Sequence, residues 1–169
     1  MKKLQQFLIC LFMVLVVCFY TPVKTVAQNG PLKLSGPRIG LTVIGGEMAH
    51  TLDEKYDAFP LVTQFGWQFE WRYFSVDDGP TGVVELVPLI GGVEQGLFLP
   101  SINLLIGMRS VTGLEIGIGP NLSISGSSIV FAAGLTKTTG KINWPINFAI
   151  LPSQKGLRFS VLFGFNIAE

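Results

Sequence analysis

Apolar and polar residues alternate along most of the chain from about residue 38 onward, most clearly over residues 61–74. Aromatic side chains fall on one parity of this segment: Phe65, Trp67, Phe69, Trp71 and Tyr73. Gln64, Glu70 and Arg72 fall on the other. Successive side chains of a strand point to opposite faces, so a period of two predicts a β-strand here.

Seven other segments alternate in the same way, although 83–91 is apolar on both faces in its second half. They span residues 38–47, 83–91, 97–109, 113–124, 129–138, 142–151 and 157–167. The connections between them are mostly short and rich in Gly, Ser, Pro and Asp, which is typical of hairpins. Residues 48–60 form the one long connection, and we expect a loop without a helix there.

The predicted strands are close to ten residues long, which matches the roughly 9 to 11 residues that cross a bilayer at a tilt. Strands of soluble proteins usually have about 5 to 6 residues. After residue 27 no apolar run approaches the roughly 18 residues of a membrane-spanning helix. The sequence therefore predicts an all-β fold, an eight-stranded antiparallel transmembrane β-barrel.

The polar face of these strands consists mainly of Gly, Ser, Asn and Gln, and the lysines lie at turns and strand ends. Such residues suit the interior of an eight-stranded barrel, which side chains just fill. The bulky face is then expected to contact lipid, with Tyr73 and Trp144 near an aromatic girdle. The expected lipid-facing aromatics are Phe65, Trp67, Phe69, Trp71, Tyr73, Trp144, Phe148, Phe159 and Phe163. A soluble β-sandwich with an aromatic core and a soluble, secreted lipocalin-like binding protein are the alternatives.

Six charged residues share the parity opposite the bulky face: Glu70, Arg72, Glu85, Arg109, Glu115 and Arg158. One closed barrel would place them together in its lumen. They should form ion pairs there, since an unpaired buried charge costs several kcal/mol. The alternative is a gated polar path or a small-ligand site, because charges within a membrane often mark such pathways.

The N-terminus has the features of a cleaved secretory signal peptide over residues 1–27. Lys2 and Lys3 precede an apolar run over residues 7–20, and a small-residue sequence ends at Ala27. An uncleaved anchor helix and a lipoprotein site at Cys18 are the alternatives. Residues 28–169 then form a single β-barrel domain.

Composition limits the chemistry that residues 28–169 can perform. This span has no cysteine and one histidine, His50, so we expect no metal site, no cofactor and no thiol nucleophile. Nine basic and eleven acidic residues give it a net charge of about −2, which argues against nucleic acid as a partner. A membrane lipid hydrolase would have to use His50, and the nearest serines in sequence, Ser35 and Ser75, lie in no recognisable motif.

Three short sequences carry a resemblance to a known class: Gly66-Trp67-Gln68-Phe69-Glu70-Trp71, Gly119-Pro120-Asn121-Leu122-Ser123 and Gly156-Leu157-Arg158-Phe159-Ser160. Together with the signal peptide and the eight strands, they resemble small outer-membrane β-barrel proteins of the Bacteroidetes type. The resemblance implies a place in the bacterial outer membrane with both termini periplasmic. It implies a structural, adhesive or minor, porin-like transport role without catalysis, with membrane lipid and the barrel assembly machinery as partners and any small-molecule ligand unknown. The chain departs from the pattern at its end, Ile167-Ala168-Glu169, which lacks the usual terminal aromatic residue.

Overall fold

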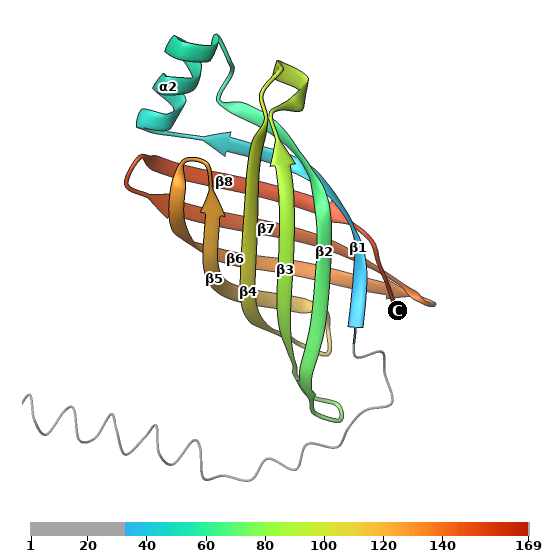
Figure 1. Ribbon diagram of the computed structural model, residues 1–169. Helices are drawn as coiled ribbons and strands as arrows, with labels where there is room; N and C mark the ends of the chain where they lie inside the picture. Colours follow the sequence, from blue (N-terminus) through green and yellow to red (C-terminus); the bar gives the residue numbers. More distant parts are fainter. Residues whose placement is uncertain (1–32, 169) are drawn as a thin grey trace, which may run out of the picture.

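The computed structural model describes residues 33–168, which fold into a closed antiparallel β-barrel (Figure 1). The predicted signal peptide lies outside the described residues. The strands are β1 (Lys33–Ile44), β2 (Leu61–Ser75), β3 (Thr81–Gly91), β4 (Leu99–Arg109), β5 (Leu114–Ser123), β6 (Gly126–Thr139), β7 (Ile142–Ser153), β8 (Gly156–Gly164) and β9 (Asn166–Ala168). A helix, α2 (Glu47–Tyr56), and a short 3-10 helix, η1 (Val93–Gln95), complete the described elements.

The sheet closes because β1 pairs with strands on both of its edges. Leu41 lies opposite Thr63 of β2 and opposite Val161 of β8. The segment expected as the last strand is interrupted at Phe165, and the following β9 pairs with the same neighbours as β8, namely β1 and β7. Counting β8 and β9 as one interrupted strand gives an eight-stranded barrel, so the predicted fold class is confirmed.

Strand boundaries differ from the predicted ones mainly where small polar residues are part of the hydrogen-bonded ladder. The first strand begins at Lys33 instead of Arg38. Ser127 and Ser128, which we expected in a turn, pair with Leu122 and Asn121 in the β5–β6 ladder. Serine is common in turns but is also compatible with a strand. The expectation of a turn at Ser127 and Ser128, which rested on composition, is therefore wrong.

The expectation that the long connection lacks a helix is wrong, because Glu47–Tyr56 forms α2. Glu47 lies in its first turn and Lys55 in its last, where their charges are favourable for the helix dipole. Of its residues only Leu52 is fully buried, so the sequence carries little of the 3.6-residue apolar pattern that reveals a helix. Within residues 33–168 the structure contains no helix whose length and hydropathy would allow it to span a bilayer.

The two ends of the barrel differ, and we name them by what they carry. The helix end carries α2, η1 and the turns at residues 124–125 and 154–155. The terminal end carries Lys33, Ala168 and the connections 76–80, 110–113 and 140–141. Backbone hydrogen bonds attach the start of α2 to the β7–β8 hairpin, with Met48 N donating to Lys155 O at 3.0 Å and Gly45 N to Leu157 O at 2.8 Å.

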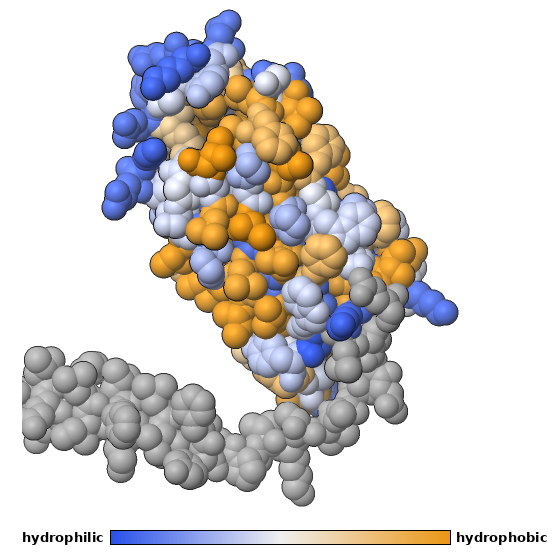
Figure 2. All heavy atoms as spheres, in the orientation of Figure 1, coloured by the Kyte–Doolittle hydropathy of each residue, from blue (hydrophilic) through white to orange (hydrophobic). Residues whose placement is uncertain are grey.

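Alternate side chains divide between the outside and the inside of the barrel, as the period of two predicts. The outer wall is apolar on every strand, and exposed aliphatic and aromatic side chains cover the visible face in Figure 2, while polar residues gather at α2. The interior is less polar than expected, because it contains two apolar clusters. One is Val87, Leu89 and Leu162, and the other is Leu105, Val130 and Leu151. Inward Val87 and Leu89 explain why both faces of segment 83–91 are apolar.

A substitution at Gly156 can test how the start of α2 is attached to the β7–β8 hairpin. The φ of Gly156 is +136°, and a Cβ built there would lie 1.9 Å from Gly45 O. Gly126 occupies the corresponding place in the β5–β6 hairpin with φ +118°, and nothing lies within 4 Å of its built Cβ. Both Gly→Ala variants carry backbone strain of about 1 to 3 kcal/mol, and only Gly156→Ala adds a clash.

We therefore expect Gly156→Ala to lower the free energy of unfolding in urea more than Gly126→Ala does. We also expect it to speed tryptic cleavage after Lys55, because α2 loses its fixed position on the hairpin. Equal destabilisation by the two variants, with unchanged cleavage after Lys55, would show that this contact does not hold the helix.

Candidate functional site

The six charged residues singled out from the sequence all lie on the inner side of the barrel wall. Glu70, Glu85, Arg109, Glu115 and Arg158 are buried, and Arg72 is half-buried. The nine aromatic residues of the opposite parity are all exposed: Phe65, Trp67, Phe69, Trp71, Tyr73, Trp144, Phe148, Phe159 and Phe163. The charged residues come from β2, β3, β4, β5 and β8, so which of them meet depends on the register of the closed sheet and not on any local motif.

Arg109 joins two carboxylates inside the barrel, toward the terminal end. Its Nη1 and Nη2 donate to the two oxygens of Glu70 at 2.8 and 2.6 Å, a bidentate arrangement. Its Nε donates to Glu115 Oε1 at 2.5 Å. Arg72 Nε lies 3.5 Å from Glu70 Oε1. These four residues, which we call the lumen ion network, link β2, β4 and β5 across the interior.

Arg38 is a buried cation that the sequence analysis did not single out. Its Nε donates to Gln68 Oε1 at 2.9 Å and its Nη2 to Asn166 Oδ1 at 2.8 Å. Its Nη1 donates to the carbonyl oxygens of Pro37 and Phe165 at 2.9 and 3.4 Å, next to the interruption between β8 and β9. Arg38 thus satisfies backbone groups where the ladder is broken. Within segment 38–47, Arg38 falls on the face opposite the apolar Ile39, and this alternation could have identified it as an inward residue.

Glu85 lies directly opposite Glu70 in the β2–β3 register, yet it is not part of the lumen ion network. Within residues 33–168 it makes no hydrogen bond and no ion pair. Its side chain borders two cavities of about 50 and 20 Å³. The expected pairing of all six charges therefore does not extend to Glu85.

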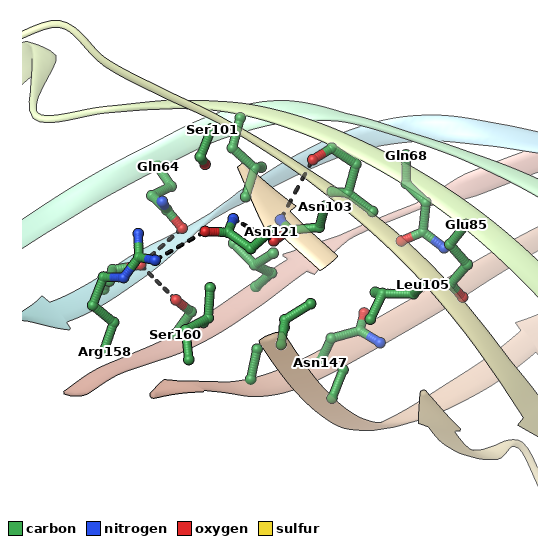
Figure 3. A pocket seen from close by; sticks show the side chains of 18 residues that line it. Gln64, Gln68, Glu85, Ser101, Asn103, Leu105, Asn121, Asn147, Arg158 and Ser160 are labelled. Atoms are coloured by element: carbon green, nitrogen blue, oxygen red, sulfur yellow. Dashed lines mark hydrogen bonds between the residues drawn. The ribbon is translucent and has the colours of Figure 1, made fainter. Parts of the chain in front are cut away.

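Arg158 is also separate from the lumen ion network, because it lies toward the helix end among neutral groups (Figure 3). Its Nη2 donates to Asn121 Oδ1 at 2.9 Å and to Ser128 Oγ at 3.0 Å. Its Nη1 has a long contact of 3.5 Å with Ser123 Oγ, and its buried Nε has no hydrogen-bond partner among the described residues. Asn121 Nδ2 in turn donates to Asn103 Oδ1 at 2.7 Å.

The interior that these side chains leave open is small. The cavity of about 50 Å³ in Figure 3 extends between Arg158 and Glu85. A single water needs roughly 10 to 15 Å³ of such space, so a few water-sized molecules fit and no larger solute does. Polar side chains and the two apolar clusters together fill the barrel, as expected for eight strands.

The helix end contains a larger cavity of about 430 Å³ above Arg158. Glu94 and Gln95 attach η1, which precedes the lining residues Gly96 and Leu97, to the start of β2. Thr63 donates to Glu94 through its backbone N at 2.8 Å and through its hydroxyl, and Gln95 Nε2 donates to Leu61 O at 2.9 Å. Partial desolvation acts in the opposite direction, but the hydrogen bonds from Thr63 prevail and lower the pKa of Glu94 to about 2.

His50, the residue that a hydrolase would require, lies exposed on α2. Within residues 33–168 no hydrogen bond involves its imidazole, and no group of three or more His, Cys, Asp and Glu side chains is arranged to hold a metal ion.

No family model matches the chain, and no curated protein sequence matches it. Among solved structures, it is similar to Ail, the attachment invasion locus protein of Yersinia pestis, at 12% identity and a TM-score of 0.49, over 79% of this chain and 97% of that one. The same protein in complex with the heparin analogue sucrose octasulfate gives 11% identity and a TM-score of 0.49, over 80% and 97%. The solution structure of a de novo designed protein, TMB2.3, gives 14% identity and a TM-score of 0.44, over 83% and 97%.

The lumen ion network predicts a large effect of removing its central cation. We expect Arg109→Met to lower the free energy of unfolding by about 3 to 5 kcal/mol, because Glu115 and Glu70 would lose their buried partner. Lys55→Met, on the exposed surface of α2, should change it by no more than about 0.5 kcal/mol. Urea unfolding of both variants in detergent measures the difference. Similar stability of the two variants would show that the network contributes little.

Proposed function

We propose that the protein is an integral β-barrel of a bacterial outer membrane, with a closed lumen and a structural or adhesive role. The observation that carries this proposal is the exposed apolar wall. Every strand from β1 to β8 presents aliphatic or aromatic side chains outward, including Leu41, Trp67, Ile106 and Phe148. A soluble protein rarely exposes so continuous an apolar surface, whereas a bilayer requires one.

The distribution of charged and aromatic residues agrees with a bilayer around the middle of the barrel. Exposed charges lie at the two ends, for example Glu54 at the helix end and Asp77 at the terminal end. Tyr73 and Trp144 lie near the terminal end of the wall, where an aromatic girdle would meet the lipid headgroups. Closure of the sheet also satisfies the backbone groups that no lipid could bond.

The inside-out arrangement argues against a soluble lipocalin-like protein. Such a protein places its apolar face inward around a ligand, but here the inward face carries the lumen ion network and Asn121. The filled interior likewise argues against a pore, since water-filled channels belong to barrels of about 16 strands or more. A minor transport role would need the lumen ion network to rearrange.

An adhesive role would fall to the helix end. With both termini in the periplasm, α2 projects from the outer surface, and it is the largest described element outside the strands. Its exposed side chains include Glu47, His50, Asp53 and Lys55. Among the described residues, the opposite end offers only short connections. Membrane lipid and the barrel assembly machinery are the partners that this proposal requires.

The test is expression in a Gram-negative host followed by fractionation and electrophoresis. We expect the protein to stay in the outer-membrane fraction after high-salt washing and to migrate differently before and after boiling in detergent, because a closed barrel has no free edge from which to unfold. In planar bilayers it should give no steady conductance. Recovery in the soluble fraction with identical mobility would contradict the membrane location, and a stable open conductance would contradict the closed lumen.

A further inference from the structure

The cavity of about 430 Å³ at the helix end has the size of a small-molecule site, for which about 300 to 1,000 Å³ is typical. Helix α2 borders one side of it, and the segment from η1 to β4 borders the other. Apolar side chains form much of the wall: Ile44, Met48, Leu52, Leu97, Leu99 and Ile124. The cavity is separate from the lumen ion network, and the proposed function assigns it no role.

The charged residues that line this cavity are all basic. Arg158 and Lys155 are among its lining residues, and no Asp or Glu is. Glu47 and Glu54 of α2 are close in sequence to residues that line the cavity, but both are exposed and do not line it. The cavity therefore combines an apolar wall with a positive charge.

Arg158, like Arg38, forms no ion pair among the described residues, and it differs from both other buried arginines in having a buried Nε without a hydrogen-bond partner. Arg109 binds two carboxylates, and Arg38 is surrounded by amide and backbone oxygens. Arg158 contacts only neutral groups, with one long contact at Nη1 and none at Nε. Since a buried charge is costly without a partner, a bound anion would stabilise this arrangement.

We propose that the helix-end cavity binds a small amphiphilic carboxylate, such as a free medium-chain fatty acid, with its carboxylate on Arg158 and its hydrocarbon part between α2 and Leu97. A planar carboxylate suits a guanidinium, which can donate two parallel hydrogen bonds. Arg158 lines both this cavity and the small one beneath it, so it lies at the inner end of the larger cavity. An acid that binds Arg158 through its carboxylate therefore enters head first. The acyl chain of a membrane lipid, entering tail first, would instead bring its apolar end to the arginine. The binding site goes beyond the proposed function and does not depend on it.

The experiment titrates octanoate, and separately octanol, into the full-length mature protein in phosphatidylcholine nanodiscs, with empty nanodiscs as the blank. Calorimetry and ¹³C signals of carboxyl-labelled octanoate follow binding. We expect saturable binding of octanoate at one site per barrel. Octanol should bind about tenfold to a hundredfold more weakly, because hydrogen bonds to charged groups contribute more than neutral ones.

Two variants and one control locate the site. Arg158→Gln should weaken octanoate binding by a similar factor and bring it close to that of octanol. Leu97→Trp keeps the positive charge but fills the cavity, so it should also abolish binding, and it provides a test if Arg158→Gln does not fold. Arg72→Gln removes an arginine at the terminal end and should leave binding unchanged.

Equal binding of octanoate and octanol, unchanged binding in Arg158→Gln, or uptake no greater than that of empty nanodiscs would each overturn the proposal. Competition of octanoate by added phosphatidylglycerol would assign the site to a lipid headgroup and likewise overturn it. If the protein proves soluble, the same titration in buffer still tests the cavity. Failure of the membrane proposal and failure of this one are thereby distinguishable.

Discussion

The closed eight-stranded sheet encloses an interior that only side chains can fill, and this constraint governs the rest of the structure. An inward charge is costly unless a partner within the barrel compensates it, because water reaches the interior poorly. Arg109 meets this requirement by binding Glu70 and Glu115 together, which joins three strands. Arg38 meets it differently, by donating to the carbonyl oxygens of Pro37 and Phe165 next to the interruption of the last strand.

The same constraint makes the two halves of the interior different. Toward the terminal end, Arg109 pairs with Glu70 and Glu115, and these side chains fill the lumen. Toward the helix end, amides and hydroxyls surround Arg158 beneath a cavity that α2 helps to enclose. The half nearer the termini is therefore suited to stability, and the half nearer α2 has the space and the charge for recognition.

Much of the fold could be predicted from sequence because successive side chains of a strand point to opposite faces, so a strand produces a period of two in the sequence. The parity that places Trp67 outward also places Glu70 inward, and no knowledge of strand pairing is needed for that step. Which charges meet is another matter, since it depends on the register between β2, β4 and β5. That is why the pairing of Arg109 and the separate positions of Glu85 and Arg158 could not be read from the chain.

Two other features were beyond prediction for similar reasons. Helix α2 buries only Leu52 and so lacks a clear apolar face, and its position depends on contacts with the β7–β8 hairpin. The helix-end cavity is formed by segments distant in sequence, among them Met48, Leu97 and Lys155. Neither the cavity nor the unbalanced charge at its base leaves a local pattern in the sequence.

In the proposed arrangement the face bearing Trp67 meets lipid, while the opposite face is enclosed. All three tryptophans of the chain, Trp67, Trp71 and Trp144, lie on the outer wall. The most direct measurement is their fluorescence after reconstitution into vesicles of brominated phosphatidylcholine, compared with vesicles of the unbrominated lipid. We expect strong quenching by the brominated lipid and little quenching by aqueous iodide. Unchanged fluorescence in brominated lipid, together with efficient quenching by iodide, would contradict this arrangement.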